Sequence, residues 1–72
     1  MPCVSDDGKP TESGVKMLQA LKAGKATPEQ IAAATEMSLY RIRSGIRELV
    51  AAGYVVESDG SYALTAQGTA AL

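Results

Sequence analysis

The chain has 72 residues, 46% of them hydrophobic, and a formal net charge of −1, so it forms one small domain with a single core. This length excludes an active-site cleft between two domains, and no apolar run is long enough for a membrane span. The lone Cys3 excludes an internal disulfide. Because no basic start precedes an apolar stretch, we expect a cytoplasmic protein without a signal peptide.

Residues 1–12 predict a flexible lead-in, because prolines, a glycine and aspartates follow one another there without apolar periodicity. We therefore expect the folded domain to span residues 13–72. Its first helix is indicated by Val15, Leu18 and Leu21, which recur at a spacing of three. We expect Gly24 to end this helix as a glycine C-cap.

The second predicted helix begins with Thr27-Pro-Glu-Gln30. Thr27 is the expected N-cap, Pro28 occupies the first helical position, and Gln30 completes a capping box. Within this helix we expect Ile31 and Ala34 to point inward. Only three residues separate it from the next helix, and a turn that short predicts a helix-turn-helix.

The third predicted helix covers residues 38–52, with Ser38 as its N-cap and Gly53 as its stop. Its apolar residues recur at i, i+4 and i+7, the spacing of one buried face: Ile42, Ile46 and Leu49. Gly45 falls beside this stripe. It indicates either close packing against the second helix or no particular role, because a mid-helix glycine costs about 1 kcal/mol relative to alanine.

The polar face of the same helix is cationic. At about 100° per residue, the residues opposite the core are Tyr40, Arg43, Ser44 and Arg47. Three arginines in this stretch face a single acid, Glu48, so positive charge gathers on this helix although the whole chain is slightly acidic. The alternative interpretation is a solvated helix face that only keeps a small protein soluble.

After Gly53, two short apolar segments flank Asp59-Gly60, the dipeptide typical of a two-residue type I′ hairpin turn. Apolar residues occur on both faces of this hairpin, since Val55 would oppose Leu64 and Val56 would oppose Ala63. The pattern leaves open which face covers the helices. Thr65 then caps a short last helix, which completes an α+β, mainly helical fold class.

The order of these elements resembles the winged helix-turn-helix family, most closely bacterial regulators of the multiple-antibiotic-resistance repressor type. Three features between residues 14 and 72 carry this resemblance: the buried aliphatics of the third helix, the step Gly53-Tyr54-Val55, and the phrase Leu64-Thr65-Ala-Gln-Gly68. The resemblance implies three helices followed by a two-stranded β-hairpin wing, and sequence-dependent binding of double-stranded DNA by a small transcriptional regulator. These are framework residues, so they support the fold more strongly than the function.

In a DNA-binding role the helix over residues 38–52 would lie in the major groove, where arginine pairs with guanine. Arg43 and Arg47 are the candidates for bases, and Tyr40 and Ser44 for bases or phosphates. The remaining candidates, expected to hold the phosphate backbone, are Lys25, Ser38 and Arg41.

Two departures from the family pattern bear on function. The wing tip Glu57-Ser-Asp-Gly60 is acidic, so we do not expect it to grip phosphate. The long helices through which such regulators dimerise are not in this sequence, so useful affinity would require a homodimer or a protein partner. The rival hypothesis is a winged-helix module for protein–protein interaction with no direct DNA binding. A third is a fragment of a longer regulator.

An enzymatic function is not indicated. The chain has no histidine, and hence neither the commonest general base nor an imidazole metal ligand. Gly24-Lys25 departs from a phosphate-binding loop, because Ala26 replaces the hydroxyl residue and Gln19 stands at the first glycine position. We therefore expect no cofactor, no metal and no small-molecule site.

Overall fold

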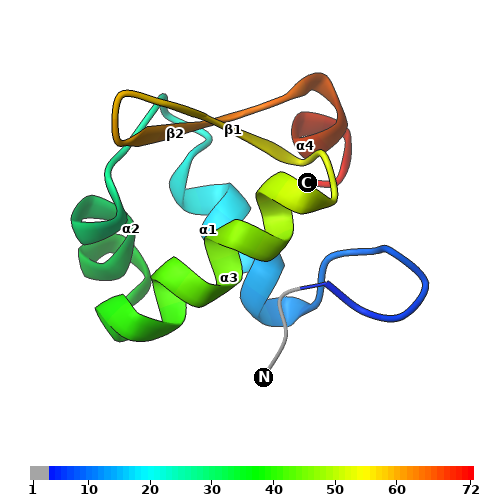
Figure 1. The fold of residues 1–72 in the computed structure, drawn as a ribbon, viewed down its shortest axis with the longest axis horizontal. Coiled ribbons are helices and arrows are strands. Elements are labelled where there is room, and N and C mark those ends of the chain that lie inside the picture. Colours follow the sequence, from blue (N-terminus) through cyan, green and yellow to red (C-terminus); the bar gives the residue numbers. More distant parts are fainter. Residues whose placement is uncertain (1–3) are drawn as a thin grey trace.

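The computed structural model describes residues 4–72 and confirms the predicted α+β fold class (Figure 1). Helices are followed by a two-stranded antiparallel hairpin and a short last helix, an order compatible with a winged-helix-like arrangement. The elements are α1 (Glu12–Ala20), α2 (Pro28–Thr35), α3 (Leu39–Ala51), β1 (Val55–Ser58), β2 (Ser61–Leu64) and α4 (Ala66–Ala70). Within residues 4–72, none of these helices has the length and apolar character to cross a bilayer.

The core lies where the first three helices meet the base of the hairpin. Figure 1 shows α3 crossing α1, with α2 beside them and the hairpin lying across the top of the helices. Each of these elements contributes large apolar side chains that are almost completely buried. They are Met17, Leu18, Leu21, Ile31, Ile42, Ile46, Leu49, Tyr54 and Val55.

The capping predictions for α2 and α3 are confirmed. The backbone N–H of Gln30 donates to the Thr27 hydroxyl (3.2 Å), and the N–H of Thr27 donates to the Gln30 side chain (2.9 Å), which closes the capping box. Ser38 caps α3 by accepting from the N–H of Arg41 (3.3 Å). Each bond satisfies an N–H group that has no partner within its helix, so both helix starts are held in place by their own local sequence.

The predicted end of α1 was wrong. The helix ends at Ala20, with Leu21 as its C-cap, and Gly24 lies beyond it. The N–H groups of Leu21, Lys22 and Gly24 donate to carbonyls three residues earlier, so the chain leaves α1 through tight turns. This path still buries Leu21, which follows Gly14, Met17 and Leu18 on one inward stripe.

The inward face of α2 also differs from its prediction. Ile31 is buried, as expected, but Ala34 is exposed. Instead Ala32 packs against the core, and Thr35 is half-buried with its hydroxyl donating to the carbonyl of Ile31 (2.7 Å). The helix has therefore rolled toward the Ala32 side, and Thr35 occupies an inward position because its polar group is satisfied.

The hairpin has the predicted turn and register. Val55 pairs with Leu64 and Val56 with Ala63, and Asp59 and Gly60 both have positive φ, 51° and 82°, as a type I′ turn requires. The structure decides the face that the sequence left open: Val55 is buried against the helices, whereas Val56 is 51% exposed.

Two connections tie the hairpin to the rest of the domain. Ala26, in the α1–α2 connection, pairs with Tyr62 through two backbone hydrogen bonds (2.9 and 2.8 Å), adding a one-residue bridge to the edge of β2. The Thr65 hydroxyl donates to the carbonyl of Gly53 (2.6 Å) and accepts from the N–H of Gly68 (3.1 Å), which confirms Thr65 as the N-cap of α4. The hairpin is thus bonded to the α1–α2 connection through Tyr62 and to the segment after α3 through Thr65.

Before α1, the described residues form a closed loop. Val4 pairs with Pro10, and the Ser5 hydroxyl donates to the Asp7 carboxylate, which also accepts from the N–H of Lys9 (3.1 Å). The Ser5 bond, followed by the Lys9 bond, lowers the pKa of Asp7 below its ordinary value. These bonds stabilise the Asp7 carboxylate, so they are lost when the pH falls below the lowered pKa of Asp7 and the group takes up a proton.

The expectations for Cys3 fall outside the described residues, and the predicted domain boundary stays a prediction.

The Tyr54 hydroxyl anchors this loop by donating to the carbonyl of Gly8 (2.6 Å). We expect Tyr54→Phe to lower the free energy of unfolding by about 1 kcal/mol, the usual loss for one hydrogen bond, and to speed amide exchange at Gly8. Denaturant unfolding and hydrogen exchange measure the two effects. Tyr40→Phe is the control, because Tyr40 lies in solvent; equal losses in both variants would contradict this role of Tyr54.

Candidate nucleic-acid interface

Helix α3 has one fully buried face and one exposed face. Ile42, Ile46 and Leu49 are buried, and Gly45 is buried beside them. On the opposite side Tyr40 is 83% exposed, and Arg43, Ser44 and Arg47 are exposed as well. The predicted division of the helix is confirmed, because the 3.6-residue period places every third or fourth residue on one side.

The four residues of the exposed face form a single surface. Tyr40, Arg43, Ser44 and Arg47 together line one shallow, open depression along α3. The depression presents two guanidinium groups, a phenol and a hydroxyl, and carries no acidic side chain of its own. Such a set of donors suits phosphate oxygens and the acceptor edges of bases.

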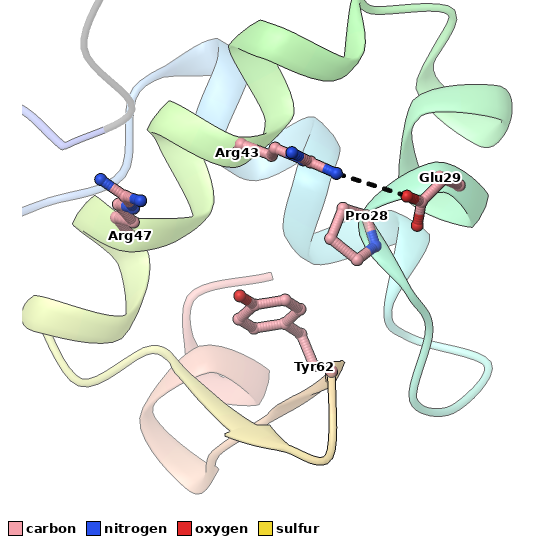
Figure 2. A pocket seen from close by; sticks show the side chains of 6 residues that line it. Pro28, Glu29, Arg43, Arg47 and Tyr62 are labelled. Atoms are coloured by element: carbon pink, nitrogen blue, oxygen red, sulfur yellow. Dashed lines mark ion pairs between the residues drawn. The ribbon is translucent and has the colours of Figure 1, made fainter.

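A second depression, which we call the wing groove, separates α3 from the start of α2 and the hairpin. Figure 2 shows the side chains that line it from three elements. The ring of Tyr62 on β2 faces α3, and Arg43 extends across from α3 toward α2. The lining residues are Pro28, Glu29, Arg43, Arg47, Gly60 and Tyr62.

The two arginines of the wing groove differ in their partners. The Arg43 guanidinium lies 3.6 Å from the Glu29 carboxylate, an ion pair whose two side chains are 63% and 62% exposed (Figure 2). Arg47 lies one turn further along α3, away from Glu29. Within residues 4–72, neither Arg47 nor Arg41 is in an ion pair. Arg47 is therefore the arginine of this face that is available to a ligand without losing a partner.

The other predicted contact residues lie outside the α3 depression. Ser38 is exposed, but its hydroxyl is engaged in capping α3. Arg41 is exposed and lies on the flank of the helix rather than in the depression. Lys25 comes from the α1–α2 connection, one residue before Ala26, which pairs with β2. These three residues do not line the α3 depression, and their predicted backbone contacts stay predictions.

The main residue that the sequence patterns missed is Glu29. It follows Pro28 in the first turn of α2, where an acid is favourable for the helix itself because of the helix dipole. The helix dipole alone explains an acid at this position, so the sequence did not indicate that Glu29 pairs with an arginine of another helix. Tyr62 packs partly against the core, and its place in the wing groove follows only from the fold.

The hairpin tip adds negative charge at the other side of the groove. Glu57 accepts a hydrogen bond from the N–H of Gly60 (3.2 Å), which keeps its carboxylate at the turn beside exposed Asp59.

Comparison with known proteins adds no relative: no protein-family model matches the sequence, and no curated protein is significantly similar to it. Any assignment of function therefore rests on the geometry and charge of the α3 face.

Proposed function

We propose that the protein binds double-stranded DNA by inserting α3 into the major groove. The observation that carries the proposal is the cationic depression of Tyr40, Arg43, Ser44 and Arg47, exposed on the side of α3 opposite the core. A major groove is wide enough to admit one α-helix, and it displays acceptor atoms on guanine that match a guanidinium group. Arg47 and Arg43 are proposed to contact bases.

The start of α3 supports the same docking. The turn between α2 and α3 is short, with Glu36 in the left-handed conformation (φ 59°), and Ser38 at the cap is exposed. The first N–H groups of a helix attract phosphate. We propose that this end of α3 rests on the sugar–phosphate backbone, with Arg41 and Lys25 as further phosphate contacts.

The proposed biological role is that of a small transcriptional regulator, as the resemblance in the sequence implies. With about three to five phosphate contacts, counterion release gives a slope of log K against log salt of about −3 to −4. Binding by one copy is therefore weak. A second copy of the chain or a protein partner would supply the affinity that a regulator needs.

An NMR titration of labelled protein with a mixed-sequence DNA duplex tests the proposal. We expect shifts at residues 38–47 and at Lys25, which weaken between about 50 and 200 mM salt. Arg43→Ala and Arg47→Ala should each weaken binding and leave the fold intact. Lys9→Ala, which removes a cation from the loop before α1, is the matched control. Unchanged affinity in both arginine variants would remove the α3 docking mode.

One observation favours a second candidate function, a module for protein–protein interaction. Val56 is 51% exposed on the outer face of the hairpin, whose tip carries the acidic residues Glu57 and Asp59. An exposed apolar residue on a hairpin with an acidic tip suits a protein partner better than a nucleic acid. The absence of any DNA-induced shift at low salt would favour this candidate.

A further inference from the structure

The pairing of Arg43 with Glu29 bears on how strongly the α3 face binds an anion. Both side chains are nearly two-thirds exposed, so the pair itself contributes little to stability. Its geometry matters more: the Glu29 carboxylate lines the wing groove together with Arg43 and lies against the Arg43 guanidinium (Figure 2). A phosphate group and Glu29 would therefore use the same guanidinium.

Glu29 is held in this position by the local structure of α2. It follows Pro28, which has a restricted φ, and it lies inside the capping box closed by Thr27 and Gln30. Its partner Arg43 lies near the middle of α3, whose opposite face is buried. The two helix backbones are thus well anchored and present the carboxylate and the guanidinium to each other. The ion pair can therefore break by rotation of the side chains alone.

We propose that Glu29 is an intramolecular competitor for DNA, which occupies Arg43 and thereby limits the affinity of the α3 face. This inference rests on the proposed DNA-binding function. In the free protein Glu29 holds the guanidinium, and on a duplex a phosphate or a guanine edge must displace the carboxylate. A DNA contact of poor geometry does not compensate for the lost Arg43–Glu29 ion pair, so Glu29 suppresses binding to mixed-sequence DNA. Glu29 thereby acts as a residue that determines specificity.

The test measures affinity for a mixed-sequence duplex as a function of salt. We expect Glu29→Gln to bind about 1.5- to fivefold more tightly at low salt, the range that an exposed ion pair provides. If the released Arg43 takes up a phosphate contact, the salt slope also steepens by about 0.9. Thermal unfolding should show little change, because the pair is exposed.

Glu12→Gln is the matched control. Glu12 is also an exposed first-turn acid, in α1, so its replacement removes the same charge and the same interaction with a helix dipole. We expect this control to leave the affinity and the salt slope as in the wild type. An equal gain in both variants would overturn the proposal, because net charge alone would then explain it.

A double variant separates competition from simple repulsion. In the Arg43→Ala background, Glu29→Gln should no longer tighten binding, because the competitor has lost its partner. A gain that persists there would overturn the proposal in favour of direct repulsion between Glu29 and DNA. If Glu29→Gln binds the duplex with the same affinity as the wild type, this inference alone is overturned. No binding by any variant would overturn the proposed function with it.

Discussion

We expect Gly68→Ala to lower the free energy of unfolding by about 3 kcal/mol, at the upper end for overpacking a core. A Cβ at Gly68 would lie 2.1 Å from the backbone carbonyl oxygen of Tyr54 and 3.2 Å from Leu64 Cδ2. The Tyr54 oxygen accepts a hydrogen bond from Thr65, and the Tyr54 N–H donates to Leu49 at the end of α3. Because that backbone is bonded on both sides, it has no room to shift.

The effect is opposite in sign to helix propensity, which favours alanine over glycine by about 1 kcal/mol inside a helix. Thermal unfolding should show a fall in Tm of about 12 °C or more for a domain of this size. Thr69→Ala, at an exposed position of the same helix, is the control and should change Tm little. A Tm as high as that of the wild type in Gly68→Ala would mean that α4 is not packed against Tyr54.

The largest expected effect on binding comes from Arg47→Glu, which should weaken binding to a mixed-sequence duplex by about a hundredfold. A lost arginine–guanine contact accounts for about 1–3 kcal/mol, and the new carboxylate faces phosphate. It also lies one helical turn from Arg43, where opposite charges attract, so it would add a second carboxylate that competes with DNA for that arginine. The fold should be retained, since Arg47 is exposed and both residue types favour helix.

Affinity measurements by fluorescence anisotropy at low salt would quantify this loss, and circular dichroism would check the fold. The control is Lys9→Glu, which makes the same change of net charge in the loop before α1, away from α2 and the start of α3 (Figure 1). If both reversals reduced affinity equally, only the net charge would matter, and the α3 docking mode would be wrong.

The exposed half of the candidate site was predictable from the sequence, because it depends on one helix. The period of Ile42, Ile46 and Leu49 placed Tyr40 and Arg47 on the opposite side, and the structure has them there. The engagement of Arg43 was not predictable. Glu29 belongs to another helix, and the distance between the two charges depends on how α2 and α3 pack.

Features governed by neighbouring residues were determined by the sequence itself. The capping box at Thr27, the N-cap at Ser38 and the type I′ turn at Asp59-Gly60 each involve residues within three positions of one another. Their hydrogen bonds and backbone angles form wherever the local sequence permits. The turn type also sets the strand register, so the pairing of Val55 with Leu64 followed from it.

The tertiary structure decided the features that depend on which apolar side chains share one core. It buried Val55 rather than Val56 and turned Ala32 rather than Ala34 inward. It ended α1 at Ala20 and joined Ala26 to Tyr62 across the domain. In each case the local sequence was compatible with more than one arrangement, and the close packing of the shared core selected the one observed.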